Sequence, residues 1–213
     1  MNLPRVWLVG IALLLLAGCS LPTDEGLPIG VLYQDDFAAD TGNWLLESDL
    51  DASASYAEGR LHQHVAAPNL IAWAELVDRQ FTDFVLEVDA TQVAGPDDNS
   101  YGVVFRLRGP SAYYRFDVTG DGYYTFIRRD EADGGRWTEI IDWTESPAIH
   151  RGASTNRIKI VAQGSHFGFY VNEQQVAEAE DGTYPSGAIG LDAGSFDEAG
   201  VQIAFDNLTI RQP

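Results

Sequence analysis

The sequence predicts an all-β fold, an antiparallel sandwich or barrel. Aromatic and β-branched residues alternate with polar ones in short runs, and Gly, Asp, Asn and Pro separate the runs. Few stretches show the 3.6-residue period of an amphipathic helix. Strands are therefore expected at Tyr56–Val65, Phe84–Val93, Tyr101–Arg108, Tyr113–Val118, Tyr123–Arg129, Arg157–Ala162, Gly168–Asn172, Gln175–Glu180, Ala188–Ala193 and Val201–Arg211.

The N-terminus has the features of an export signal. Arg5 precedes an apolar run that ends in Ala17-Gly18, too short for a spanning helix of about 20 residues. The chain's one cysteine, Cys19, comes next, so it has no disulfide partner within the chain. The sequence Leu16-Ala17-Gly18-Cys19 resembles the lipobox of bacterial lipoproteins. This resemblance implies that residues 1–18 are a signal peptide and that Cys19 carries a lipid.

Residues 19–30 are expected to form the lipidated cysteine and a flexible spacer, because this stretch is rich in Pro, Gly and polar residues. Residues 31–213 are long enough for one domain with its own core. The formal net charge of −19 argues against nucleic acid and anionic membrane surfaces as partners, since both repel such a chain. The expected location is outside the cytoplasm, on the bacterial cell membrane, held by acyl chains.

The clearest predicted hairpin covers residues 113–128. A two-residue turn at Gly120-Asp121 or at Asp121-Gly122 would place glycine where a positive φ is needed. Both turns predict the same two faces, because their registers differ by two residues. The predicted core face holds Tyr114, Phe116, Val118, Tyr123, Thr125 and Ile127, and the predicted outer face holds Tyr113, Arg115, Asp117, Tyr124, Phe126 and Arg128.

A ligand-binding surface is predicted on that outer face. Alternation in Tyr101–Arg108 directs two more arginines away from the core, and Glu87 and Asp89 are expected to be their cross-strand partners. Arginine offers planar donors and tyrosine a flat amphipathic ring, which together suit sugar hydroxyls or carboxylates. A ladder of exposed ion pairs is the alternative interpretation. The predicted binding residues are Arg106, Arg108, Tyr113, Arg115, Tyr124 and Arg128.

Several short motifs resemble exported domains of the concanavalin A-like lectin/glucanase superfamily, with laminin-G-like and 3-keto-disaccharide hydrolase domains as the most similar groups. The motifs include Tyr-Tyr-Arg-Phe at 113–116, Gly-Asp-Gly-Tyr-Tyr at 120–124 and Phe-Asp-Asn at 205–207. The resemblance covers about residues 33–211 and implies a two-sheet jelly roll. Because this fold hosts lectins, glycosidases and adhesion modules, it does not define one function.

No catalytic residue is predicted. Laminarinase-like members carry Glu-x-Asp-x-Glu on one strand, whereas this chain has Glu87-Val88-Asp89-Ala90-Thr91, and Thr91 cannot protonate a leaving group. Calcium is a possible cofactor, because Asp97-Asp98-Asn99 and Asp117 with Asp121 could supply oxygen ligands, although neither has EF-hand spacing. No other metal site is predicted.

The expected function is that of a lipid-anchored, surface-exposed binding module for a glycan or a glycan-bearing envelope component. Each tryptophan of the domain, Trp73 among them, is either a core residue or a stacking platform for a sugar ring. One alternative is a glycoside-active enzyme of the 3-keto-disaccharide hydrolase type. Another is a structural or adhesion domain of the envelope that binds protein.

Overall fold

The computed structural model describes residues 29–213, so the predicted signal segment and Cys19 lie outside the described residues. These residues form fifteen strands and one short 3-10 helix, Glu131–Asp133. The strands build two antiparallel sheets packed face to face, which confirms the predicted β-sandwich of the jelly-roll type. Within residues 29–213, no helix is long and apolar enough to cross a membrane.

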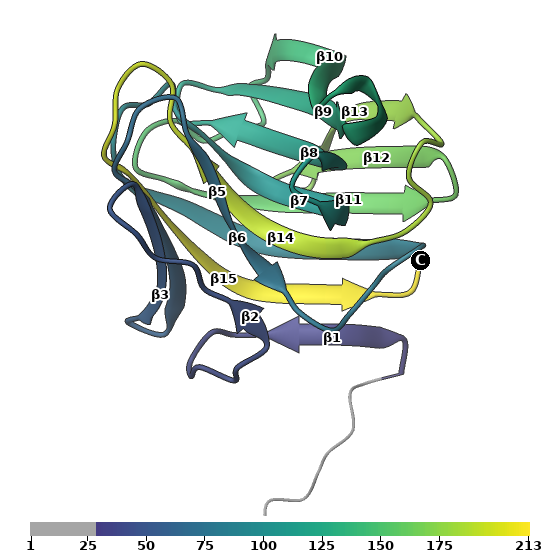
Figure 1. The fold of residues 1–213 in the computed structure, drawn as a ribbon, viewed down its shortest axis with the longest axis horizontal. Coiled ribbons are helices and arrows are strands. Elements are labelled where there is room, and N and C mark those ends of the chain that lie inside the picture. The colour runs from purple at the N-terminus through teal and green to yellow at the C-terminus, as the bar shows by residue number, and fades with distance from the viewer. Residues whose placement is uncertain (1–28) are drawn as a thin grey trace, which may run out of the picture.

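The first sheet, sheet A, has the strand order β13-β12-β11-β6-β15-β4-β3, and β1 pairs with β15. Figure 1 shows β1 beside the C-terminal strand, so the two ends of the domain lie close together. The strands are β1 (Val31–Asp35), β3 (Ala52–Ala57), β4 (Arg60–Val65), β6 (Phe84–Ala94), β11 (Thr155–Gln163), β12 (His166–Val171), β13 (Gln174–Glu180) and β15 (Val201–Arg211).

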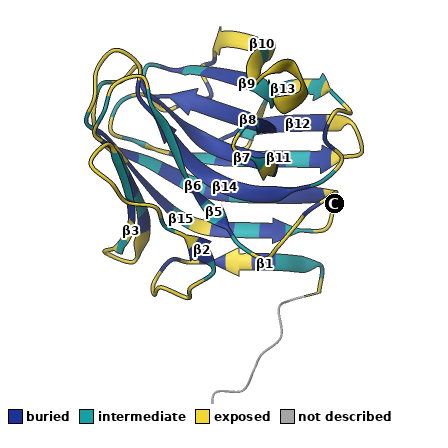
Figure 2. Cartoon of the chain, viewed as in Figure 1, coloured by how far each residue is buried: buried dark blue, intermediate teal, exposed yellow. Residues whose placement is uncertain are grey.

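The second sheet, sheet B, has the order β10-β9-β8-β7-β14-β5-β2. Strand β10 lies at one edge and is largely exposed, whereas β7, β8 and β14 are buried over nearly their whole length (Figure 2). The strands are β2 (Trp44–Leu45), β5 (Ile71–Leu76), β7 (Ser100–Gly109), β8 (Ala112–Thr119), β9 (Tyr123–Asp130), β10 (Arg136–Glu145) and β14 (Ala188–Gly194).

Aromatic rings from both sheets fill the space between them. Phe116 of β8 stacks on Phe169 of β12 with ring centroids 4.4 Å apart, and Phe105 of β7 meets Phe167 of β12 at 5.5 Å. All four rings are fully buried. Such pairs add about 0.5–1.5 kcal/mol each beyond the area they bury, so this cluster joins the two sheets.

A tight turn between β3 and β4 changes the predicted strand boundaries. Glu58 and Gly59 both have positive φ, 52° and 71°, and they connect β3 to β4 with Ala57 opposite Arg60. Two consecutive positive φ values define a type I′ hairpin turn. The prediction of a single strand over residues 56–65 is therefore wrong. This range contains the end of β3, the turn and the whole of β4, which pair with each other as a hairpin.

The predicted register of the hairpin at residues 113–128 is wrong by one residue. Thr119 and Tyr123 are joined by a three-residue loop. Phe116 therefore pairs with Phe126, whereas the two predicted turns would pair it with Thr125 or with Ile127. A one-residue slip moves every side chain of a strand to the other face. Phe126 is accordingly fully buried in the core, together with Tyr124, whereas Ile127 is half-buried on the opposite face.

The predicted pairing of Glu87 and Asp89 with Arg106 and Arg108 is also wrong. Strand β6 belongs to sheet A and β7 to sheet B, so the acids and those arginines lie on different sheets. The acids pair instead with bases on neighbouring strands of sheet A, because β6 lies between β11 and β15. The contacts are Asp89 with Arg157 at 2.7 Å, and Glu87 with Arg211 at 2.9 Å and Lys159 at 3.5 Å.

Candidate functional site: the outer face of sheet B

The outer face of sheet B is the face turned away from sheet A. An antiparallel sheet in a sandwich usually exposes this face to solvent, yet β8 and β14 are buried on both faces. A second apolar cluster, separate from the main core, covers part of it. Its members are Val104, Leu107, Tyr113 and Ala188, with Trp73 packed against them.

A buried cluster of charges occupies the middle of the same face. Arg115 donates from Nε to Asp192 at 2.6 Å and from Nη2 to Ser100 at 2.9 Å, and it also pairs with Asp117. Burial raises the pKa of Asp117 well above its ordinary value, and the charge of Asp192 adds to this rise while Arg115 opposes it. We call Arg115, Asp117 and Asp192 the buried triad.

Glycine makes room for the buried triad. A Cβ on Gly102 would lie 2.9 Å from the Asp117 carboxylate, and one on Gly194 would lie 2.9 Å from the Arg115 guanidinium. At Gly102 the Cβ would also clash with the Phe116 carbonyl oxygen, so the backbone would have to shift, whereas at Gly194 the crowding comes from the side chains of Ser100 and Arg115. The glycines on β7 and β14 are therefore required by packing on the outer face.

Beside the apolar cluster, three adjoining hollows form a groove along β5. The central hollow, of about 390 Å³, is lined by Leu45, Trp73 and Pro110 among others. It shares Glu75, Leu107 and Gly109 with a hollow of about 520 Å³ at one end, and Trp73 and Glu47 with a smaller one at the other. We call this the Trp73 groove, defined by Leu45, Glu47, Trp73, Glu75, Arg79 and Arg108.

Trp73 is held firmly while one side stays accessible. Its ring lies 5.5 Å from the ring of the fully buried Tyr113, and residue 73 as a whole is half-buried. Alternation along β5 directs Ala74 and Leu76 into the main core, which leaves Trp73 and Glu75 on the outer face. The result is a fixed aromatic surface with a carboxylate two residues away on the same side.

Several charged groups of the groove have no partner within the described chain. Arg108 is exposed and makes no ion pair or side-chain hydrogen bond within residues 29–213, and the same holds for the carboxylates of Glu47 and Glu75. Partial burial and the nearby Glu47 raise the pKa of Glu75. The groove therefore presents free donors and free acceptors around one aromatic ring.

Arg106, predicted to face outward, points into the protein. Its φ of 49° marks an irregular step in β7, where the pairing with β8 and β14 shifts register. The guanidinium donates to the carbonyl oxygens of Tyr184 at 2.8 Å, Gly164 at 2.8 Å and Thr82 at 3.0 Å. Since these carbonyls belong to three separate loops, Arg106 acts as a structural clamp and is inaccessible to a ligand.

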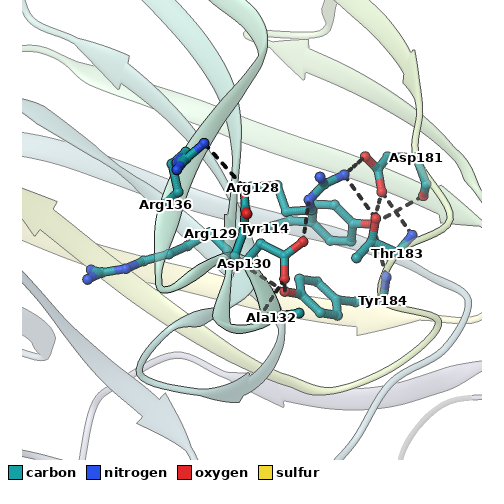
Figure 3. A network of polar contacts seen from close by, with 10 residues as sticks. Tyr114, Arg128, Arg129, Asp130, Ala132, Arg136, Asp181, Thr183 and Tyr184 are labelled. Carbon is teal, nitrogen blue, oxygen red and sulfur yellow. Dashed lines mark hydrogen bonds and ion pairs between the residues drawn. The ribbon is translucent and has the colours of Figure 1, made fainter.

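Arg128 lies at the end of the sandwich in a network of polar contacts (Figure 3). It pairs with Asp181, which also accepts from the Tyr114 hydroxyl at 2.6 Å. Burial and this hydrogen bond raise the pKa of Tyr114 to about 12. Tyr184 closes the network by donating to the Arg129 carbonyl at 2.9 Å. The network fixes the β13–β14 loop against β8 and β9.

The six predicted binding residues therefore do not form one surface. Arg108 lines the Trp73 groove, and Tyr113 supports Trp73 from beneath. Arg115 belongs to the buried triad, and Arg106 is in the interior. Tyr124 is a core residue, and Arg128 is in the end network, because the register of β9 differs from the predicted one.

The residues considered for calcium are also dispersed. Asp117 faces Arg115, and Asp97 accepts from the Gln92 amide at 3.3 Å, whereas Asp98 and Asp121 line a separate hollow. Within residues 29–213, no group of three or more His, Cys, Asp or Glu side chains is arranged to hold a metal ion.

The sequence predicts Trp73 either as a core residue or as a platform for a sugar ring, and it does not predict Glu47, Glu75 or Arg79 as site residues. Strand β5 was not among the expected strands, although Ile-Ala-Trp-Ala-Glu-Leu alternates with period two. That alternation is the signal that would have placed Trp73 and Glu75 on one face.

The sequence profile of the 3-keto-alpha-glucoside-1,2-lyase-like domain family matches residues 38–211. The chain belongs to this family, whose members have a jelly-roll fold of the concanavalin A-like type, in agreement with the two-sheet sandwich. Comparison with curated protein sequences gives no match.

Among solved structures, the fold is similar to a carbohydrate-binding module, CBM66, from Bacillus subtilis, with 18% identity, a TM-score of 0.55 and coverage of 80% of this chain and 96% of that one. A protein of unknown function with a galectin-like fold, from Bacillus subtilis, has 15% identity, a TM-score of 0.62 and coverage of 86% and 96%. An endo-β-galactosidase from Clostridium perfringens that releases GlcNAcα1-4Gal has 11% identity and a TM-score of 0.62, with coverage of 86% and 63%. At these identities, the likeness establishes the fold.

Proposed function

We propose that this chain is a carbohydrate-binding domain that holds a neutral glycan in the Trp73 groove. The observation that supports this most directly is the combination of one accessible, rigidly supported tryptophan with unpaired Arg108, Glu47 and Glu75. The flat ring offers an apolar surface for the hydrogen-bearing face of a sugar. Sugar hydroxyls both donate and accept, so they match a groove that offers both kinds of group.

The charge of the groove favours a neutral ligand over an acidic one. Glu47, Glu75 and Asp78 are among its lining residues, and Arg79 and Arg108 are the bases. Arg79 lies over the ring of Tyr33, 5.0 Å from its centre, which leaves Arg108 as the freer of the two cations. With a formal net charge of −19 for the whole chain, a polyanionic glycan would be repelled on approach.

The test is a glycan array followed by titration of the best ligand. The purified full chain is compared with Trp73→Ala and with Trp143→Ala, a matched control because Trp143 is an exposed tryptophan on β10 outside the groove. We expect Trp73→Ala to weaken binding at least about tenfold, or roughly 1.4 kcal/mol, and Trp143→Ala to leave it unchanged. Binding that survives Trp73→Ala would place the site elsewhere.

A second candidate function is turnover of a glycoside in the same groove. It is favoured by the presence of two carboxyl groups, Glu47 and Glu75, in one hollow and by the raised pKa of Glu75, because a carboxyl group with a raised pKa can act as a general acid. The test is turnover of 3-keto-glucosides by the wild type and by Glu75→Gln. Loss of turnover with retained binding in Glu75→Gln would support an enzyme, and binding without turnover in the wild type would support the binding domain.

The location is a further part of the proposal. The lipobox-like sequence before Cys19 supports export and attachment by lipid, followed by a short Pro- and Gly-containing spacer. Such a tether would keep the domain outside the cytoplasm and close to the envelope, where glycans are abundant.

A further inference from the structure

We propose that a second site, at the loop end of sheet B, binds an organic ammonium group. The site is a hollow of about 240 Å³, and its lining residues come from four separate segments of the chain. We call it the Trp143 pocket, lined by Asp98, Thr119, Asp121, Tyr123, Trp143 and Phe196. It shares no lining residue with the Trp73 groove.

Two large aromatic side chains are exposed at this pocket. Trp143 and Phe196 are 37% and 39% exposed, and their rings meet edge to face with centroids 5.9 Å apart. Exposed apolar surface gathered from distant segments is typical of binding sites, because hydration of such surface is unfavourable. Tyr123 adds a third ring from the start of β9.

The loop that carries Phe196 is held in place by the backbone. The Phe196 carbonyl accepts from the backbone N–H of Asn69 at 2.8 Å, and the backbone N–H of the neighbouring Ser195 donates to the Leu70 carbonyl at 2.9 Å. These contacts fix the residue next to β14 and β5. The backbone at Phe196 is thus part of the folded scaffold, so this segment needs little ordering when a ligand binds.

The charged groups of the Trp143 pocket are both acidic. Neither Asp98 nor Asp121 forms an ion pair within residues 29–213, and no lining residue is Lys, Arg or His. The Thr119 hydroxyl donates to Asp121, which fixes that carboxylate beside the rings, whereas Asp98 has no side-chain hydrogen bond within the described chain.

This combination favours a cation over a neutral sugar. A cation is attracted by the negative face of an aromatic ring, and two carboxylates without ion pairs add attraction that a neutral group does not receive. Aromatic rings bordered by acids are the arrangement by which proteins bind quaternary ammonium groups. The Trp73 groove differs, because Arg79 and Arg108 accompany its carboxylates.

The test uses pairs of small probes that differ in charge. Choline is titrated against 3,3-dimethylbutan-1-ol, its uncharged analogue of equal shape, and glucosamine against N-acetylglucosamine, with binding followed by calorimetry on the full chain. We expect each ammonium to bind at least about tenfold more tightly than its neutral partner. Preference for choline would indicate a head group as the natural ligand, and preference for glucosamine an amino sugar.

Variants separate charge from ring stacking. Asp98→Asn keeps the shape of the pocket and removes no hydrogen bond within residues 29–213, so it is expected to weaken ammonium binding several-fold without changing thermal stability. Trp143→Ala is expected to weaken both members of each pair. Trp137→Ala is the matched control, since Trp137 is 38% exposed on the same strand and outside the pocket.

Three outcomes would overturn the proposal. The first is equal affinity for a cation and its neutral analogue, and the second is unchanged ammonium binding in both Asp98→Asn and Trp143→Ala. The third is no saturable binding of choline or glucosamine in the millimolar range. None of these results depends on Trp73, so they leave the glycan-binding proposal to its own test.

Discussion

Replacement of Arg115 by alanine is expected to destabilise the domain severely. The change would leave the carboxylates of Asp117 and Asp192 buried with no cation between them. Removing one member of a buried ion pair costs about 3–5 kcal/mol, which is a large part of the 5–15 kcal/mol of a typical domain. The arginine contributes in this way because its carboxylate partners cannot reach water.

Urea unfolding, followed by tryptophan fluorescence, measures this effect. With a slope of about 2 kcal/mol per molar, a loss of about 3–5 kcal/mol lowers the midpoint by roughly 1.5–2.5 M. Arg108→Ala is the control, because this exposed arginine has no partner within residues 29–213 and its loss is expected to change stability by less than about 0.5 kcal/mol. The reasoning is refuted if Arg115→Ala costs under about 1 kcal/mol with an unchanged slope.

Three further predictions address the register, the triad and the anchor. Phe126→Ala is expected to lower the free energy of unfolding in urea by about 3–5 kcal/mol and Ile127→Ala by clearly less, since the three-residue loop directs Phe126 into the core. A larger loss for Ile127→Ala would instead support the two-residue turn. The pKa of Asp117 is raised in the folded protein, so the proton on this carboxyl group stabilises the fold fully below pH 3.8, the ordinary pKa, and less as pH rises through the pKa of the folded state. Asp117→Asn cannot lose this proton, so its stability relative to the wild type is expected to increase with pH. A flat difference between these two proteins from pH 3.8 upward would show that the pKa is not raised. Cys19→Ala is expected to move the protein from the membrane fraction to the soluble fraction without unfolding it, and retention in washed membranes would contradict lipid attachment.

The strand content could be predicted from sequence because alternation and turn residues are local properties. The many short strands predicted a sandwich or a barrel, and the resemblance to concanavalin A-like domains implied the two-sheet jelly roll that the structure confirms. The register of the β8–β9 hairpin could not be predicted from these local patterns. Gly120, Asp121 and Gly122 are compatible with loops of two or three residues, and one residue decides which side of β9 is buried.

Arg106 is a second residue whose position could not be predicted, because the alternation of side chains along its strand is interrupted. The pattern in β7 predicts an outward side chain, but a residue with positive φ interrupts the strand and turns the guanidinium inward. Positive φ is uncommon for arginine, so the sequence gives little warning of it. Three loop carbonyls and the Phe167 ring, 4.9 Å away, supply the environment that stabilises the buried charge.

The composition of a binding hollow depends on which strands and loops become neighbours. Trp73 and Arg108 come from β5 and β7, which are separated in sheet B by β14, and Glu47 comes from the loop after β2. Local patterns identify an aromatic or a charged residue but not its distant neighbours, so the sequence supplied Trp73 and Arg108 as separate candidates. The loops then decide whether free carboxylates are accompanied by arginine, as in the Trp73 groove, or by aromatic rings alone, as in the Trp143 pocket. One sheet can therefore offer two sites of different chemistry, one on its outer face and one at its loop end, each testable without the other.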